Sequence, residues 1–244
     1  MRVFYAFCRS VDDLADDDTL PLEQRRSALQ EWHDGISRGF SSPDPLQQEL
    51  ISLRDRYEIP NKLLLGIIEG CQMDLDAQRF ECWDDLENYI WKVSCTVGLV
   101  SIRIFGCEAP ESESYAISLA KALQLTNILR DVGEDLRDRQ RIYLPMQDLH
   151  QFGYSADELT RGVRNERFLE MMNFQALRAQ NFYEEAELNL TSYDRAALRP
   201  ARIMSNIYHD LLEQMREDSF QVFTKRYRVS KRRKLMILIK HLFT

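Results

Sequence analysis

The chain has 244 residues and a formal net charge of −7, and its charges are unevenly distributed. Residues 225–244 contain eight Lys or Arg side chains and no acidic residue, which leaves 24 basic against 39 acidic residues, a net charge of −15, on the remainder. An acidic body argues against nucleic-acid binding and favours divalent cations as partners. No apolar run approaches the roughly 18 residues that span a bilayer, and no signal peptide is visible.

The composition favours helix throughout the chain. Gly and Pro are sparse, at 9 and 7 residues, whereas Leu, Ala, Glu, Arg and Gln are plentiful. The five cysteines include no CxxC pair and no zinc-binding spacing, and most lie in apolar helical stretches. We therefore expect reduced core thiols in a cytoplasmic protein.

The first predicted helix spans residues 1–17 and ends in an acidic run. Five of the seven residues from 12 to 18 are Asp, including Asp12 and Asp16 at a four-residue spacing. Each carboxylate at a helix C-terminus opposes the helix dipole by roughly 0.3–1 kcal/mol, and like charges one turn apart repel. The run predicts a site for something positively charged; a frayed acidic turn is the alternative.

Four further helices are predicted before residue 106, over residues 21–39, 45–57, 60–80 and 83–105. Pro45 and Pro60 stand at first helical positions, where proline is favoured. Asp74 falls near the end of the third of these helices. Gly98, inside the fourth, predicts either a close approach of a neighbouring segment or a kink.

The next predicted helix, residues 111–137, carries polar side chains in an otherwise apolar run. Asn127, Asp131 and Asp135 recur every four residues, so they share one helical face. The ladder lacks the alternating lysines of a solvated acidic face. It is therefore a candidate metal site, although a solvent-facing ladder remains an alternative at this point. A basic loop, residues 139–145, follows and ends at Pro145.

The last hundred residues are also expected to be helical. A short helix at residues 154–159 has Ser155 or Asp157 as its N-cap. Longer helices are predicted over residues 165–190 and 195–217, the latter broken or entered at Pro200, followed by a short helical turn at 219–224 and a basic amphipathic helix at 230–243. Because no alternating strand pattern or repeat is present, residues 1–244 predict one all-α domain of nine to eleven helices.

If the two acidic ladders face each other, at least four carboxylates converge and require cations to stay ionised. Oxygen ligands alone suit Mg²⁺, which commonly binds one or two carboxylates together with substrate phosphates. Arg9 and Arg130 lie beside the ladders and can bind a phosphate bidentately. The combination points to a diphosphate substrate. A di-iron bundle is excluded because no His follows a Glu at the Glu-x-x-His spacing.

Two motifs resemble those of the squalene/phytoene synthase family, the head-to-head trans-isoprenyl diphosphate synthases. YAFCRSVDDLADD at residues 5–17 is similar to the family's first aspartate-rich motif, and QLTNILRDVGED at 124–135 with RIYLP at 141–145 is similar to the second, in its phytoene-synthase form. Supporting matches are MDL (73–75), DLENYIWKVSCTVG (85–98) and DSFQVFTKRYRVSKRRK (218–234). They follow the family's order and cover nearly the whole chain.

The resemblance implies an isoprenoid synthase helical bundle around a central apolar cavity. It implies Mg²⁺-dependent condensation of two farnesyl (C15) or geranylgeranyl (C20) diphosphates, with diphosphate release, to phytoene or a squalene-type product. NADPH would be required only for squalene. A terpene cyclase of the same fold and a non-enzymatic assembly factor of the same family are the alternatives. A monomer is expected.

The resemblance also implies roles for individual residues. The implied Mg²⁺ ligands are Asp12, Asp16, Asn127, Asp131 and Asp135, with Asp13 a weaker candidate. The implied diphosphate contacts are Tyr5, Arg9, Gln124 and Arg130, and the further candidates near the reacting ends are Tyr89, Tyr208 and Lys225. Apolar residues expected to line the cavity are Val93, Val97, Leu119 and Leu123.

Three features depart from the family pattern. A helix that usually precedes position 1 is missing, the loop before RIYLP is about one residue longer, and Trp91, Ser94 and Cys95 replace smaller residues. The basic C-terminal helix has two interpretations: a solvated tail, or a peripheral contact with anionic lipid that would suit greasy substrates.

Overall fold

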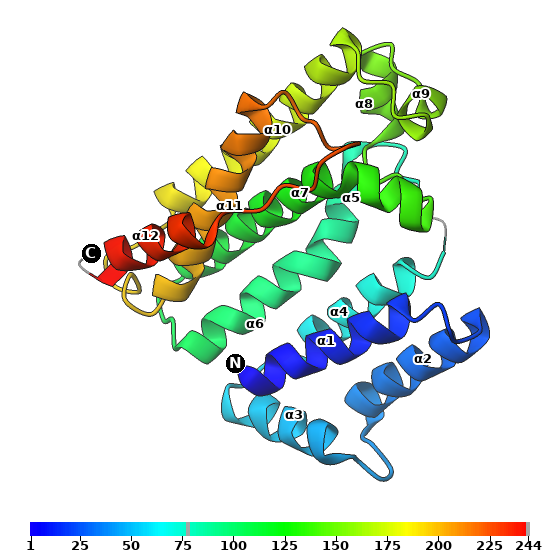
Figure 1. Ribbon diagram of the computed structural model, residues 1–244. Helices are drawn as coiled ribbons and strands as arrows, with labels where there is room; N and C mark the ends of the chain where they lie inside the picture. The colour runs from blue at the N-terminus through cyan, green and yellow to red at the C-terminus, as the bar shows by residue number, and fades with distance from the viewer. Residues whose placement is uncertain (77–78, 243–244) are drawn as a thin grey trace.

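The computed structural model describes residues 1–76 and 79–242, and within them the chain is helical (Figure 1). The helices are α1 (Arg2–Asp16), α2 (Leu22–Arg38), α3 (Pro45–Arg56), α4 (Asn61–Met73), α5 (Trp83–Ile90), the π-helix η1 (Trp91–Cys95), α6 (Thr96–Phe105), α7 (Glu111–Arg139), α8 (Met146–Gln151), α9 (Ala156–Thr160), α10 (Glu166–Leu188), α11 (Arg199–Glu217) and α12 (Lys231–Leu242). An isolated bridge between Arg79 and Ile142 is the only β pairing in the described parts. The all-α prediction is confirmed.

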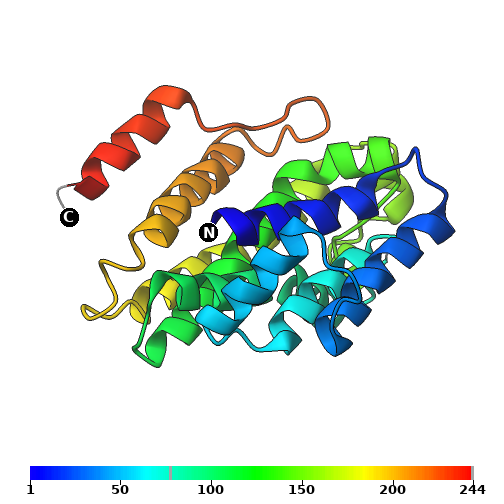
Figure 2. The same cartoon turned by 90° about the horizontal axis from the view of Figure 1, so that it is seen from below.

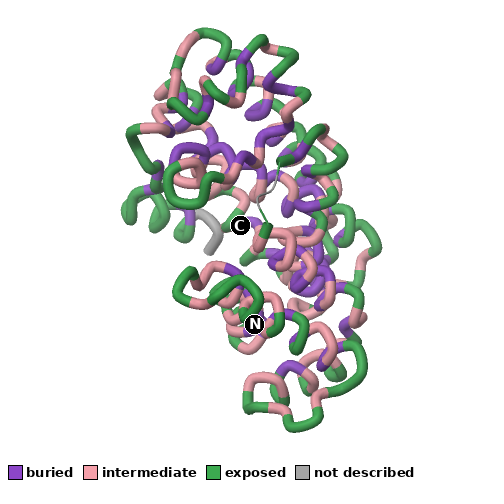
Figure 3. The backbone as a smooth tube through the Cα atoms, turned by 90° about the vertical axis from the view of Figure 1, so that its right-hand side faces the viewer, coloured by how far each residue is buried: buried purple, intermediate pink, exposed green. Residues whose placement is uncertain are grey.

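Helix α7 is the central element of the bundle. It packs along α10 and also contacts α5, η1, α6 and α11. Figure 1 shows α1 to α4 grouped on one side of α6 and α7, with α10 to α12 on the other. Buried positions follow the inward faces of these helices, whereas the outer loops and turns are exposed (Figure 3).

Several helix starts follow local sequence signals. Asp44 accepts a hydrogen bond from the Gln47 amide at 2.8 Å and completes a capping box before α3. Ser155, one of two predicted candidates, is the N-cap of α9 in the same way. Pro200 lies in the first turn of α11, as expected, although that helix begins at Arg199 and not at residue 195.

The predicted helix over residues 60–80 is too long. Helix α4 ends at Met73, with Asp74 as its C-cap, and part of the remaining predicted stretch, residues 77–78, lies outside the described residues. Further along, the Phe80 carbonyl accepts a hydrogen bond from the Met146 amide at 2.8 Å. The chain leaves the helix here because tertiary partners bind it, which a local helical pattern cannot reveal.

The predicted helix over residues 83–105 is continuous but irregular. A π-helical turn, Trp91–Cys95, separates α5 from α6. Gly98 marks a close approach, because a Cβ there would lie 3.0 Å from the Ala116 carbonyl oxygen of α7. The irregular geometry therefore lies at 91–95, one turn before the glycine that the sequence singled out.

Residues 219–224 form turns and not the predicted helical turn, and α8 was not predicted. The segment from 219 to 230, which we call the strap, crosses α7 before α12 begins (Figure 1). Gly133 of α7 makes this crossing possible, because a Cβ there would lie 2.2 Å from the Val222 carbonyl oxygen. The strap thus rests directly on the α7 backbone.

The five cysteines are all unpaired, and two of them, Cys71 and Cys95, are buried, in agreement with the expected free thiols. No helix in the described parts of the chain is long and apolar enough to cross a membrane.

Candidate active site

The two acidic ladders lie on opposite sides of one cavity. Helix α1 contributes Asp12 and Asp16, and α7 contributes Asn127, Asp131 and Asp135, to the lining of a space of about 640 Å³. The ladders face one another because α1 lies across the bundle from α7, each presenting its four-residue repeat inward (Figure 1). We call this space the polar cavity.

An arginine from the end of α7 bridges the two sides of the polar cavity. Arg139 binds Asp16 of α1 with both guanidinium branches, one of them at 2.6 Å. Arg141 lies 3.8 Å from the same carboxylate. These contacts offset the repulsion between like charges that the two ladders create.

Two other arginines neutralise the α7 side. Arg130 binds Asp131 through both of its branches, at 2.7 and 2.5 Å. Arg226, from the strap, lies 3.0 Å from Glu134 and 3.9 Å from Asp131. The strap therefore returns a cation to the acidic face of α7, next to the position where Gly133 lets it approach.

The carboxylates are nonetheless under electrostatic strain. Burial, with a further contribution from Asp131, raises the pKa of Asp135 to about 7. Burial and the neighbouring Asp16 also raise the pKa of Asp12 above its ordinary value. Both groups would ionise more readily if a cation entered the cavity.

The donor set fits Mg²⁺. The Asn127 side-chain oxygen is buried and has no hydrogen-bond partner, although it stands between the carboxylates of its ladder. Within the described part of the chain, no three acidic, His or Cys side chains converge on one point. Such spacing suits an ion that keeps several waters and binds one or two carboxylates plus phosphate oxygens.

A second space of about 310 Å³ adjoins the first, and we call it the apolar cavity. Its apolar walls include Ile67, Val93 and Val97. The residues that line both spaces, and so mark their junction, are Arg9, Asp12, Tyr89 and Gln124. A ligand with a charged head and a greasy tail matches this division. Neither Leu119 nor Leu123 lines these two spaces, contrary to expectation.

Most of the predicted site residues meet in the polar cavity. Those that line it are Arg9, Asp12, Asp16, Tyr89, Gln124, Asn127, Arg130, Asp131 and Asp135. Tyr5 lines only the apolar cavity and is 69% exposed. The Tyr208 side chain interacts with Arg130 behind the lining. These assignments as metal or diphosphate ligands stay predictions.

Two predicted residues lie outside both cavities. The Asp13 carboxylate is paired with Arg9 at 2.7 Å on the exposed side of α1, because it is one residue out of the Asp12–Asp16 register. The Lys225 ammonium pairs with Asp218 at 2.6 Å, whereas its neighbour Arg226 reaches the cavity. The structure thus replaces Lys225 by Arg226 in the candidate site.

Sequence reasoning missed several residues of this region. They are Asp74, Arg139, Arg141, Tyr143 and Arg226. The basic loop after α7 signalled cations close to the ladder, but no local pattern showed that they would contact α1. Asp74 gave a weaker signal, as an acid near a helix end.

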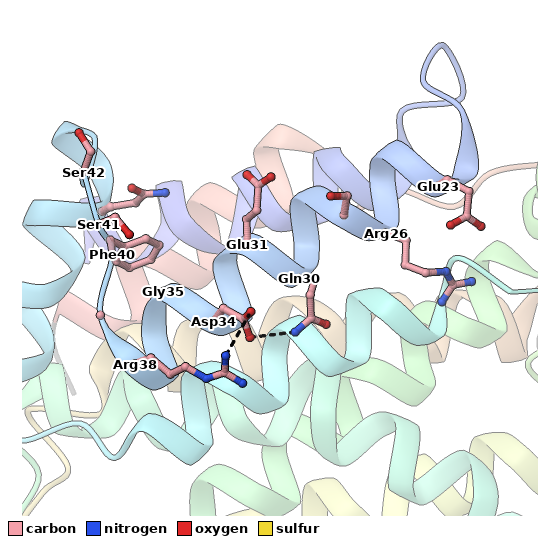
Figure 4. Close-up of a pocket in the computed structure, with 13 residues that line it drawn as sticks. Glu23, Arg26, Gln30, Glu31, Asp34, Gly35, Arg38, Phe40, Ser41 and Ser42 are labelled. Carbon is pink, nitrogen blue, oxygen red and sulfur yellow. Dashed lines mark hydrogen bonds and ion pairs between the residues drawn. The ribbon is translucent and has the colours of Figure 1, made fainter.

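A larger hollow, of about 830 Å³, lies on the outer side of α2 (Figure 4). Its polar groups bind one another: the Gln30 amide donates to Asp34 at 3.0 Å, and Arg38 lies 3.9 Å from the same carboxylate. None of the predicted site residues lines it. Size alone therefore does not identify the functional cavity.

Comparison with known proteins identifies the family. The family model described as squalene/phytoene synthase matches residues 1–233. The chain belongs to the squalene/phytoene synthase family. It is a prenyltransferase of this family, and the predicted resemblance and enzyme class are confirmed.

Relatives of known name or structure agree. The chain is 34% identical to a 15-cis-phytoene synthase of Synechococcus elongatus, over 96% of this chain and 80% of the relative. It is 32% identical to a phytoene synthase of Arthrospira platensis, with the same coverage. A crystal structure of a dehydrosqualene synthase superposes with a TM-score of 0.80 at 30% identity, covering 99% of this chain and 84% of the other.

The register of the strap can be tested with neighbouring substitutions. Arg226→Gln removes a cation from the polar cavity, so we expect the dissociation constant for inorganic diphosphate with Mg²⁺ to rise about tenfold. Lys225→Gln is the matched control, because Lys225 pairs with Asp218 outside the cavity. Isothermal titration calorimetry measures both. Equal losses of affinity in the two variants would contradict the assignment.

The raised pKa of Asp135 predicts a pH-dependent stability in metal-free protein. Its pKa is about 7 in the folded state and about 4 in an unfolded chain. Folding therefore favours the protonated form, and the stability it contributes is present below about pH 4 and lost as the pH rises through 7.

We expect the unfolding temperature in EDTA to fall less steeply between pH 4 and 8 for Asp135→Asn than for the natural chain, as measured by circular dichroism. Mg²⁺ added at pH 8 should raise the unfolding temperature of the natural chain. Parallel pH profiles for the two proteins would show that Asp135 is not under this strain.

Proposed function

We propose that this family member is a Mg²⁺-dependent head-to-head prenyltransferase that joins two allylic prenyl diphosphates and releases diphosphate. The observation that carries the proposal is the pair of acidic ladders on α1 and α7, which line one cavity together with arginines and adjoin an apolar space. Carboxylates, cations and apolar walls are the three parts that ionisation of a prenyl diphosphate requires.

The polar cavity would bind the diphosphate groups. Asp12, Asp16, Asn127, Asp131 and Asp135 would hold Mg²⁺, which when bound neutralises charge on the departing diphosphate as a Lewis acid. Arg9, Arg130 and Arg226 have guanidinium groups in the lining that can turn from carboxylates to phosphate oxygens. The ion pairs of the ligand-free site therefore keep these arginines close to where the diphosphate would lie.

The apolar cavity would keep water from the reacting carbon. Ile67, Val93 and Val97 offer no nucleophile that would trap an allylic cation. Tyr89 stands at the junction, where its ring and oxygen can stabilise developing positive charge. The electron pair of the breaking C–O bond leaves with diphosphate, and the double bond of the second substrate then attacks the cation.

Geranylgeranyl diphosphate is our proposed substrate, with phytoene as product. Support comes from the phytoene synthases that resemble this chain at 32–36% identity, and from the form of its second motif. The dehydrosqualene synthase relative makes farnesyl diphosphate the competing substrate. NADPH would enter only if squalene were the product.

Incubation with each substrate and Mg²⁺ tests the proposal. We expect diphosphate release and a C40 hydrocarbon from geranylgeranyl diphosphate, without a requirement for NADPH, as measured by a phosphate-coupled assay and mass spectrometry. Asp131→Ala should lower turnover at least a thousandfold while the helical circular dichroism signal is retained, because a buried metal ligand is lost. No diphosphate release from either substrate would refute the proposed activity.

We also propose a cytoplasmic monomer that touches anionic membrane through α12. Ile237 packs toward α11, and residues two positions away point to the opposite side of the helix. Leu235 and Ile239 occupy that outward face and are about half exposed, beside the exposed Lys231 and Arg232. Figure 2 shows α12 at the edge of the molecule, next to α11. Apolar and cationic groups on one face suit an anionic lipid surface.

Vesicle sedimentation tests the contact. We expect binding to vesicles that contain phosphatidylglycerol, little binding to phosphatidylcholine alone, and at least a fivefold loss in the double variant Leu235→Glu/Ile239→Glu. The matched control is Leu177→Glu/Leu188→Glu, which changes two exposed leucines of α10. Equal binding by the two double variants would exclude α12 as the docking element.

A further inference from the structure

One carboxylate at the edge of the apolar cavity has no part in the acidic ladders. Asp74 ends α4, lines the apolar cavity, and its side chain is 15% exposed. The Tyr89 hydroxyl lies 3.0 and 3.1 Å from its two oxygens, and the Tyr143 hydroxyl donates to one of them at 2.9 Å. Asp74 therefore joins three segments: the end of α4, the helix α5 and the loop after α7.

A cation supports this carboxylate from the side opposite the tyrosines. Arg141 donates to the Asp74 backbone carbonyl, and its guanidinium lies 4.0 Å from the carboxylate. The arginine keeps a buried negative charge affordable, since an unpaired one would strongly favour protonation. Asp74 does not line the polar cavity, where the diphosphates are proposed to bind.

The tyrosine rings are fixed by one another. Tyr89 is 4% exposed, and its ring centroid lies 5.4 Å from that of Phe80 and 5.3 Å from that of Tyr143. Burial and the Asp74 carboxylate raise the pKa of Tyr89 well above its ordinary value, so its hydroxyl stays protonated. With the ring packed and the proton shared with Asp74, the direction of the O–H bond is set.

We propose that Asp74 is a positioning residue that acts through Tyr89. It draws the hydroxyl proton toward itself, away from the junction of the two cavities, and so leaves the electron-rich side of the phenol facing the place where the allylic cation would form. Negative charge behind the ring adds to this stabilisation in a dry site. The inference rests on the proposed prenyl transfer and extends it to a residue outside both aspartate-rich motifs.

This arrangement predicts a loss in kcat without a matching rise in KM. Asp74→Asn keeps the shape and one acceptor oxygen but removes the charge, so kcat should fall about tenfold to a hundredfold. KM should change less than twofold, because Asp74 does not reach the diphosphate cavity. The fraction of substrate released as prenyl alcohol should rise, because a less stabilised cation is captured more often by water.

A double-mutant cycle tests whether Asp74 acts through Tyr89. Asp74→Asn, Tyr89→Phe and the double variant are compared with the natural chain for kcat, KM and alcohol fraction. Once Tyr89 has lost its hydroxyl, removing the charge of Asp74 should lower kcat less than threefold further. Glu49→Gln, an exposed carboxylate of α3, is the control for a general effect of charge.

The outcomes separate the two proposals. If the natural chain releases diphosphate but the two single effects multiply in the double variant, or KM rises as much as kcat falls, the role of Asp74 is refuted and the proposed function stands. If the natural chain releases no diphosphate, both fail. Should Asp74→Asn not fold, as judged by thermal unfolding, Asp74→Glu replaces it, because it retains the charge but displaces the acceptor, and the same coupling with Tyr89→Phe is expected.

Discussion

The opposition of like charges across one cavity is the constraint on which the rest of this structure depends. Carboxylates of α1 and α7 line the same space, and partial burial raises the pKa of Asp135 to about 7. Such a cavity stays open only if cations are supplied. Arg139 reaches from the end of α7 to α1, and the strap brings Arg226 across Gly133 to the α7 ladder. The loop after α7 and the strap thus have electrostatic reasons for their paths.

A second consequence is the separation of polar and apolar chemistry into adjoining spaces. The arginines and carboxylates lie on one side of Tyr89 and Gln124, and Ile67, Val93 and Val97 lie on the other. Charges in the first space can bind and neutralise a leaving diphosphate, while the second offers no nucleophile to a cation. The boundary is held by packed rings and by the hydrogen bonds of Asp74, so it is a rigid part of the bundle.

The sequence predicted the parts of the fold that local interactions control. The all-α class, the caps at Asp44 and Ser155, and the shared face of the α7 ladder follow from residue spacing and side-chain chemistry alone. It failed where distant segments decide. Residues after Met73 have a helical pattern, yet the chain leaves α4 there, and Asp74 binds hydroxyls 15 and 69 residues away. The π-turn at Trp91–Cys95 likewise has no signal beyond the later Gly98.

By itself, the sequence determined which helical faces carry the carboxylates and which family the motifs resemble, because a four-residue repeat on a helix has only one geometry. Only the tertiary structure decided which cations meet those faces. Lys225 and Arg226 are equivalent in composition, but neighbouring side chains of a non-helical strap point in different directions, and Arg226 alone of the two reaches the polar cavity. Asp74 gained its two tyrosine partners for the same reason: the position of a side chain in space depends on the packing of the whole bundle.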